Sequence, residues 1–568
     1  MLRRSGRIRR GRPRAFCYHP VRHRTQPAVN GGRTIVVGND ALADEVCRIR
    51  LADGHAVTVV WNEEPAVRRR AESRGCTFVA GNPRDAQVLL DAGVASAGVI
   101  LALSQDDGTN LEVALEAREA NPAVRIVLRQ FNRALANKLE QNLKNCSVVS
   151  LAAHSAATYA AAALDPECFL GLEFPTGSRT LVGFSRRTAR DLGVSSMGVA
   201  DAEQRLDCRI LAVNDGAHDV DHVLAPTDSL TLFGRVERLA ESSGPVRADR
   251  RSLGWVATRV QLIAAEIDPL LRVLVAAGAA VFVVATLFFG AALHLNVLTA
   301  AYFVTTTMTT VGYGDIALAD KGLLLQAAGM LLMIAGVVVA NLAIAFVAAA
   351  LIRAQWNALQ GVRPIRHAGH VVVFGAGRVG TRIVDFLCAL GASITVVERV
   401  PTPDLVARAR ARDISLLTGD GTLDATLDHC NVRAARSAVV VTDSDVTNLE
   451  IGLGARARRD TIPVIMRIAE PSFAATIRRQ FAIRRTFSAT TLAASTFCDL
   501  AGSSTARGRV TIGGAAFRLE ECPSAMADRG GVLLAAARGA GPARRMRHWD
   551  EVAPGDVALV MSALSSGA

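Results

Sequence analysis

No two of the ten cysteines in this chain form a Cys-x-x-Cys pair, and they are scattered from Cys17 to Cys522. Structural zinc sites and small disulfide frameworks both require cysteines at close, regular spacings. The spacing here therefore excludes both classes and indicates reduced, cytosolic thiols.

Acidic residues are missing from residues 1–32, which contain nine arginines. The formal net charge of the whole chain is +12, so the other 536 residues carry only +3. This segment also lacks an apolar run of the length that a signal peptide needs. It is predicted to be a basic disordered tail, either solvated or in contact with anionic lipid, and we expect no specific nucleic-acid partner.

Long apolar runs are also few, although half of the residues are hydrophobic. Val273–Leu293 has 21 residues without a charge, and Gly322–Ile352 has 31. About 20 apolar residues span a bilayer, so both segments are predicted to cross a cell membrane and the rest to be globular. Two spans leave both termini on one side, and the positive-inside rule makes that side the cytoplasm. The flanking cations are Arg247, Arg250, Arg251, Arg259, Arg353, Arg363 and Arg366.

Between the two spans lies a short glycine-containing loop, Thr310-Val311-Gly312-Tyr313-Gly314-Asp315, preceded by the apolar stretch Ala300–Met308. That stretch is too short to span, so we expect a re-entrant pore helix. Backbone carbonyls can replace the water shell of an ion, and glycines permit the unusual φ and ψ angles that such a loop needs.

The loop resembles the selectivity filter of K⁺ channels, whose sequence it matches residue for residue. The resemblance implies a homotetramer, because one chain supplies one of four loops. It also implies that K⁺ is bound by the carbonyls of Thr310, Val311, Gly312 and Tyr313 and by the Thr310 hydroxyl.

The same resemblance implies roles for residues around the filter. Tyr302 and Phe303 would brace the filter, with Tyr302 able to hydrogen-bond to Tyr313. Gly336 would be the hinge of the inner helix, with Gly329 as a rival position. Glycine relaxes helix bending, but small residues also serve helix packing.

The sequences on either side of the spans repeat one pattern of short apolar runs separated by helical stretches, which predicts two parallel α/β sheets. Gly38 matches Gly375, and Arg129 matches Arg467. Each copy continues into a smaller β-rich piece. The apolar runs are Thr34–Val37, Val57–Val60, Gly98–Leu101 and Arg125–Leu128 in the first copy, and Val371–Phe374, Ile394–Val397, Ala438–Val441 and Pro463–Met466 in the second.

The second copy contains a dinucleotide-binding pattern. Gly375, Gly377 and Gly380 follow a strand and open a helix, and Glu398 ends the next strand. Glycines let the backbone approach a pyrophosphate, the helix amino end binds it, and the acid accepts from ribose hydroxyls. The same crevice is expected to hold three residues at later strand ends, Asp420, Asp443 and Arg467.

The first copy departs from this pattern. Asp40 stands where the second glycine is expected, and Trp61 stands where the second copy has Glu398. A carboxylate repels a pyrophosphate, and the ribose acceptor is missing. We therefore interpret the first copy as a scaffold.

Two such copies around a two-span pore resemble the regulator of K⁺ conductance (RCK) domains, also called TrkA-N domains, of ligand-gated K⁺ channels. The resemblance implies a membrane α pore with two Rossmann-like α/β domains, each carrying a small α+β lobe, and a tetramer with a cytoplasmic ring of eight RCK domains. The expected divisions are 1–32 (tail), 33–165 and 166–242 (first RCK), 243–268 (linker or interfacial helix), 269–355 (pore, with spans 273–293 and 322–352, pore helix 299–309 and filter 310–315), 356–369 (linker), and 370–500 and 505–565 (second RCK).

The predicted function is a K⁺ channel gated by NAD(H) or ATP/ADP, and not an enzyme. Two alternatives remain open. A regulatory subunit of a K⁺ transport system would share the RCK domains but needs no filter. A membrane-bound NAD-dependent oxidoreductase would use the glycine pattern, but neither copy shows a catalytic base beside a substrate domain.

Overall fold

The computed structural model describes residues 32–241, 269–360 and 368–564, except 131–132, 176–177, 179, 220, 482, 524–530, 539–542, 547–551 and 554. The chain forms two compact units, one from the parts before residue 249 and after residue 363, the other from the part between. The predicted tail up to residue 31, the linker 243–268 with its possible interfacial helix, and residues 361–367 of the second linker lie outside the described residues.

The first copy is built on a six-stranded parallel sheet of order β3-β2-β1-β4-β5-β6, the doubly wound arrangement that the apolar runs predict. Its central strands are buried along their whole length, because helices cover both faces. Its elements are β1 (Thr34–Val37), α1 (Ala41–Ala52), β2 (Val57–Trp61), α2 (Pro65–Ser73), β3 (Thr77–Ala80), α3 (Ala86–Asp91), η1 (Val94–Ser96), β4 (Val99–Ala102), α4 (Asp107–Ala120), β5 (Arg125–Arg129), α5 (Arg133–Asn142), β6 (Cys146–Val149) and α6 (Leu151–Leu164).

The second copy repeats this order as β13-β12-β11-β14-β15-β16. Its elements are β11 (Val371–Phe374), α13 (Arg378–Ala389), β12 (Ile394–Glu398), α14 (Pro403–Ala411), β13 (Ser415–Thr418), α15 (Asp424–His429), η2 (Val432–Ala434), β14 (Ser437–Val440), α16 (Asp445–Arg458), β15 (Val464–Arg467), α17 (Pro471–Gln480), β16 (Arg485–Phe487) and α18 (Ala489–Gly502).

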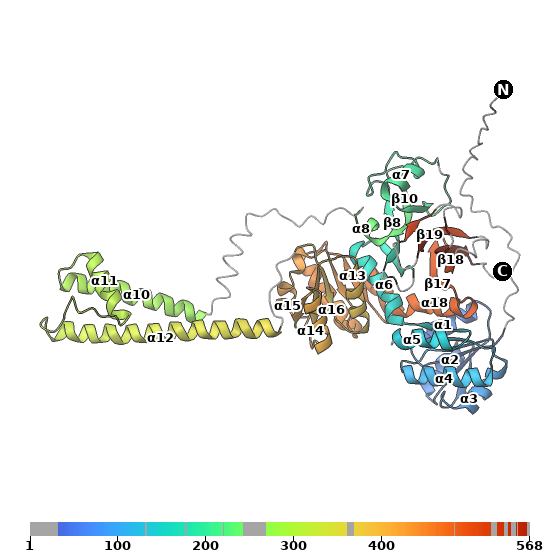
Figure 1. The fold of residues 1–568 in the computed structure, drawn as a ribbon, viewed down its shortest axis with the longest axis horizontal. Helices are drawn as coiled ribbons and strands as arrows, with labels where there is room; N and C mark the ends of the chain where they lie inside the picture. Colours follow the sequence, from blue (N-terminus) through green and yellow to red (C-terminus); the bar gives the residue numbers. More distant parts are fainter. Residues whose placement is uncertain are drawn as a thin grey trace, which may run out of the picture. The chain divides into compact units, whose positions relative to one another are not determined.

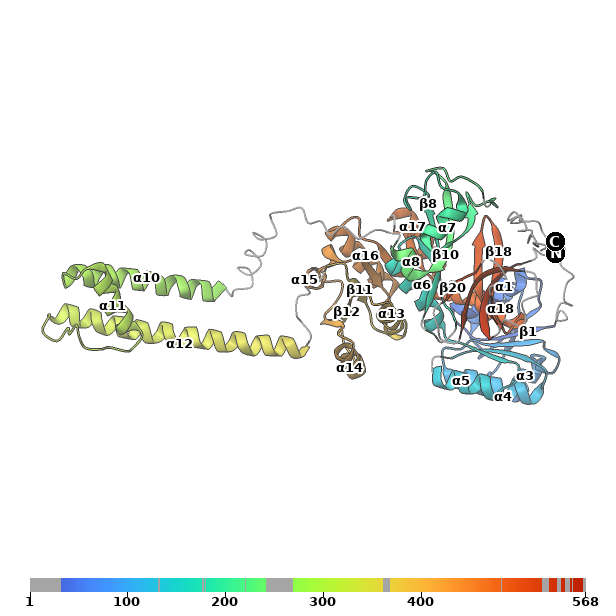
Figure 2. The same cartoon turned by 45° about the horizontal axis from the view of Figure 1, so that its top comes forward.

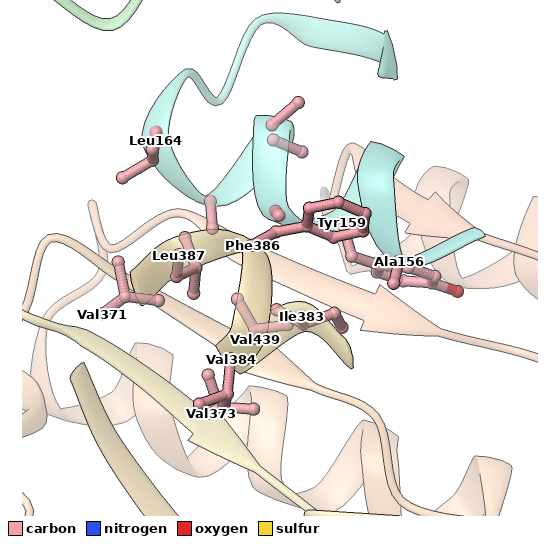
Figure 3. Packing of buried hydrophobic residues seen from close by; sticks show 14 of the residues in the cluster. Ala156, Tyr159, Leu164, Val371, Val373, Ile383, Val384, Phe386, Leu387 and Val439 are labelled. Atoms are coloured by element: carbon pink, nitrogen blue, oxygen red, sulfur yellow. The ribbon is translucent and has the colours of Figure 1, made fainter. Parts of the chain in front are cut away.

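The last helix of each copy packs on the other copy. Helix α6 lies against α13, and α18 lies against α1 (Figures 1 and 2). The buried face of α6, from Ala156 to Leu164, shares one hydrophobic core with Ile383, Phe386 and Leu387 of α13 (Figure 3). The two copies are therefore joined by a reciprocal exchange of helices within one chain.

The small lobes also pack on each other. The first lobe has a four-stranded sheet of order β7-β8-β10-β9, and the second a five-stranded sheet of order β17-β18-β21-β19-β20. Residues of both sheets, including Phe184 and Phe517, lie in one core. The elements are β7 (Cys168–Glu173), β8 (Leu181–Thr188), α7 (Val199–Leu206), β9 (Arg209–Val213), β10 (Ser229–Arg235) and α8 (Val236–Glu241), then β17 (Ala506–Ile512), β18 (Ala515–Pro523), β19 (Val532–Arg538), β20 (Arg544–Arg545) and β21 (Asp556–Ala563).

The described part of the unit between the copies contains three apolar helices, α10 (Pro269–Ala292), α11 (Val297–Met308) and α12 (Leu323–Gln360). Among the described residues, one segment passes a length and hydropathy test for a membrane span, Leu323–Phe346, with mean hydropathy 2.4. The apolar part of α10, Ala276–Ala292, is shorter than that test requires. Helix α12 continues to Gln360, so the first residues of the predicted linker 356–369 belong to the helix instead.

Candidate functional site

The filter loop follows the carboxyl end of α11 directly, and its backbone alternates in handedness. The angle φ is positive at Thr310 (62°), Gly312 (49°) and Gly314 (79°). The intervening Val311 and Tyr313 are not in this region. Glycine adopts positive φ without strain, whereas a positive φ at Thr310 costs roughly 1–2 kcal/mol. The loop therefore has the kind of backbone that the glycine spacing predicts.

A backbone carbonyl holds the start of the loop. The Thr306 carbonyl accepts the N–H groups of Val311 (2.9 Å) and Gly312 (3.0 Å), and the Thr306 side chain is buried. In the outer half of the loop Tyr313 is 71% exposed, because it has few neighbours within the chain. The sequence did not predict this role of the Thr306 carbonyl.

The two predicted supports of the filter have different surroundings. The Tyr302 and Tyr313 rings are parallel, with centroids 6.4 Å apart, and no hydrogen bond joins these two described residues. The contact is thus a stacking contact and not the expected hydrogen bond. Phe303 is 7% exposed and packs edge to face on Phe289 of α10, with centroids 5.1 Å apart. It belongs to the core of the pore unit.

Gly336 lies in the uninterrupted helix α12, close to the end of α11. A Cβ atom at this position would come within 2.6 Å of the Met308 backbone. At Gly329 the corresponding neighbour is the tip of the Leu318 side chain, at 2.5 Å. Close approach of two backbones therefore gives a packing reason for glycine at 336, besides the predicted hinge.

In the second copy the glycine-rich turn joins β11 to α13. Gly375 has φ of +92°, and Gly377 is the N-cap of α13. A Cβ at Gly380 would lie 1.9 Å from the Gly375 carbonyl oxygen, so only glycine allows helix and strand to approach this closely. A Cβ at Gly377 would meet nothing within 4 Å. The space in front of the helix amino end is therefore open.

Glu398 lies at the end of β12, beside this turn. Its Oε2 accepts the N–H of Ala376 at 2.6 Å, and its Oε1 accepts the N–H of Arg399 at 3.0 Å. The carboxylate thus stabilises the glycine-rich turn.

The remaining predicted residues lie at or just after the carboxyl ends of β13, β14 and β15, which parallel pairing places along one edge of the sheet. Asp420 accepts from the N–H (3.0 Å) and hydroxyl (2.8 Å) of Thr422, and these bonds hold the pKa of Asp420 below its usual value. Asp443 is exposed. Arg467 donates to the Thr442 carbonyl at 2.9 Å and forms no ion pair with any described residue.

A buried amide ties two of these strand ends together. Asn448 accepts the N–H of Thr442 at 2.9 Å and donates to the Arg467 carbonyl at 2.9 Å. Asn110 makes the same pair of bonds in the first copy, to Ser104 and Arg129. The two copies therefore use an asparagine at the same place for the same pair of bonds.

The first copy fills the corresponding position with its own side chains. Asp40 caps α1 by accepting the N–H groups of Leu42 and Ala43. Its other carboxylate oxygen lies 2.6 Å from Nη1 of Arg129. An internal anion therefore occupies the helix amino end and neutralises the arginine that matches Arg467. The interpretation of the first copy as a scaffold stays a prediction.

The first copy nevertheless retains a cleft of about 670 Å³ at this edge of its sheet. Trp61 and Arg84 contribute to its wall, and Arg84 is held by Asp106 at 2.8 Å. The cleft is lined by Asn39, Trp61, Asn62, Asn82, Pro83, Arg84, Ser104, Gln105, Asp106 and Thr109.

Comparison with protein families finds the TrkA-N domain twice, over residues 34–150 and 371–488, and an ion channel family over residues 270–353. Among curated proteins, the chain is 24% identical over 179 residues to the voltage-gated potassium channel Kch of Escherichia coli, covering 31% of this chain and 42% of the relative. It is 29% identical over 108 residues to a Trk system potassium uptake protein TrkA homolog of Pyrococcus horikoshii, covering 18% and 44%. The chain thus spans less than half the length of these relatives.

Among solved structures, a GsuK channel bound to NAD is similar over 97% of this chain and 79% of that chain, at 15% identity and a TM-score of 0.49. The ion channel match makes this a membrane protein. Two TrkA-N domains flank one ion channel domain here, and this chain therefore has the domain composition of the K⁺ channels that carry RCK domains.

Proposed function

We propose that this chain is the subunit of a homotetrameric K⁺ channel opened or closed by a nucleotide bound to its second RCK domain. The filter loop carries this proposal. Its sequence from Thr310 to Asp315 and its alternating positive φ angles suit a ring of carbonyl ligands for K⁺. Four copies of a loop are needed to close such a ring. The exposure of Tyr313 in one chain is in keeping with a missing neighbour.

The ligand is proposed from the difference between the two RCK copies. In the first, Asp40 lies at the helix amino end and pairs with Arg129. In the second, Gly377 leaves this position open and Arg467 has no carboxylate partner among the described residues. Helix amino ends and arginines both bind phosphate. NAD(H) or ATP/ADP would place a phosphate there and a ribose beside Glu398.

The arrangement in the membrane follows from the two predicted spans. Both termini would lie in the cytoplasm, where four chains would contribute eight RCK domains to one ring. Ligand binding would shift a pre-existing equilibrium between closed and open rings, because a ligand favours the conformation that binds it more tightly.

Flux measurements on the purified full chain test the proposal. Liposomes containing the chain should take up K⁺ and exclude Na⁺, and ADP or NAD should change the rate. A chain that conducts no K⁺ alone under any nucleotide condition would favour the regulatory-subunit alternative. Oxidation of added NADH with substrate turnover would favour the oxidoreductase.

A further inference from the structure

Helix α6 brings one hydroxyl group from the first copy into the core of the second. Tyr159 is fully buried on the face of α6 that meets α13 (Figure 3). Its ring packs edge to face on Phe487, with centroids 5.6 Å apart. Its hydroxyl donates to the Phe487 carbonyl at 2.9 Å. Burial raises the pKa of Tyr159, so the hydroxyl keeps its proton and remains a donor.

The acceptor of this bond also holds the strand end that carries Arg467. The Phe487 carbonyl accepts the N–H of Ile468, the residue after Arg467, at 3.0 Å. In the parallel pairing of β15 with β16, Arg467 lies opposite Phe487. One carbonyl oxygen therefore links the Tyr159 hydroxyl to the backbone that positions the Arg467 guanidinium.

The duplication provides an internal comparison, because α6 and α18 have equal lengths and align position for position. Phe497 of α18 takes the place of Tyr159 and is buried against the first copy. The matching carbonyl, that of Val149, accepts the N–H of Gln130 at 3.0 Å, but Phe497 has no hydroxyl to add. The Tyr159 hydroxyl thus contacts the second copy, which has the open anion position, and not the first copy, in which Asp40 occupies that position.

We propose that Tyr159 of the first copy is a positioning residue for phosphate binding in the second copy, acting through the Phe487 carbonyl on the strand end that carries Arg467. This inference rests on the proposed nucleotide site. Without the hydroxyl, a buried carbonyl loses one of its two donors and the end of β15 is less firmly held, so Arg467 is less well placed for a phosphate. Because binding energies are reciprocal, phosphate binding in turn strengthens the docking of α6. The first copy, although closed itself, thereby sets the nucleotide affinity of the second.

The test is calorimetric titration of the purified full chain with ADP and with adenosine, which lacks the phosphates. Tyr159→Phe should weaken ADP binding roughly threefold to tenfold, the range for one lost hydrogen bond, and leave adenosine binding unchanged. Phe497→Tyr, the matched change on α18, should leave ADP binding unchanged. Arg467→Met should weaken ADP binding, and adding Tyr159→Phe to it should cause no further loss.

Three results would overturn the inference while the nucleotide site stands. One is unchanged ADP affinity in Tyr159→Phe. Another is an equal loss for ADP and adenosine, which would indicate a purely structural effect. The third is full additivity of the losses in ADP binding free energy caused by Tyr159→Phe and Arg467→Met. This comparison needs no adenosine, so it decides the matter even if adenosine binding is too weak to titrate. If the unmodified chain binds no ADP or NAD, the proposed function fails and this inference fails with it.

Discussion

Asp40 and Arg129 form an ion pair in front of the amino end of α1, with 2.6 Å between Oδ2 and Nη1. Both side chains are largely buried, with exposed fractions of 17% and 7%. At the matching position in the second copy, Gly377 has no side chain and Arg467 forms no ion pair with a described residue. The duplication thus presents one occupied and one open version of the same anion position.

Transferring the carboxylate should close the second copy. Gly377→Asp fits sterically, because a Cβ there meets nothing within 4 Å and φ is −67°. The new carboxylate would cap α13, pair with Arg467 and repel a phosphate. We expect ADP affinity of the full chain to fall by about tenfold or more, since charged hydrogen bonds are worth roughly 1.5–3 kcal/mol. Titration calorimetry measures the change.

Gly377→Asn is the matched control for this variant. It offers the same cap and nearly the same volume without the charge, so its loss of ADP affinity should be much smaller. Equal losses for the two variants would mean that volume, and not charge, closes the site.

Glu398→Ala should weaken NAD binding by about tenfold, because a ribose loses a charged acceptor. The unmodified chain should also prefer NAD(H) to NADP(H), since a carboxylate repels a 2′-phosphate. Glu398→Ala should reduce this preference. Because Glu398 also accepts the N–H of Ala376, Glu398→Gln serves as the control that preserves a side-chain acceptor. A chain that binds NADP(H) as tightly as NAD(H) would contradict the ribose assignment.

Gly312→Ala should abolish selective K⁺ conduction, because a side chain at φ of +49° strains the filter backbone. Gly322→Ala is the matched control, since Gly322 also has positive φ (+88°) and open space around its Cβ but lies beyond the filter. The ratio of K⁺ to Na⁺ permeability in liposomes should collapse only in the first variant. An unchanged ratio would remove the filter assignment.

Substitutions at Gly336 and Gly329 should separate packing from bending. Gly336→Ala would press on the Met308 backbone, which cannot move away easily, whereas Gly329→Ala would meet only the tip of Leu318. We expect the first to reduce the thermal stability of the channel clearly more than the second. Gly336→Pro removes a backbone donor and kinks the helix, so it should shift open probability strongly while selectivity remains. If Gly329→Pro alone does this, the hinge lies at 329.

The exchange of helices predicts that the two halves do not fold separately. Residues 33–242 and 370–568, expressed apart, each lack the helix that covers one face of their sheet and should be insoluble or aggregated. Expressed together they should form a soluble complex, because α6 and α18 can then reach their partner cores. Gel filtration of single and combined expressions measures this. Two soluble monomeric fragments would show that the exchange contributes little stability.

The sequence alone determined those features whose signal is local. The filter depends on a contiguous loop, and the central strands β1, β4, β11 and β14 read as apolar runs because a sheet covered on both faces buries every residue. The outer strands β3, β6, β13 and β16 were not predicted, since edge strands are only partly buried and do not form continuous apolar runs. The glycine pattern likewise predicted the turn that opens α13 beside the edge where the carboxyl ends of the parallel strands meet.

Only the tertiary structure decided which groups meet across large sequence separations. Asp40 and Arg129 are 89 residues apart, and Tyr159 and Phe487 are 328 apart. The apolar face of α6 would suit either copy equally well, because its residues indicate that the helix is buried but do not indicate which copy it packs against. The closed first copy, the role of Glu398 in the glycine-rich turn and the exchanged helices all follow from such long-range contacts, which depend on packing in three dimensions.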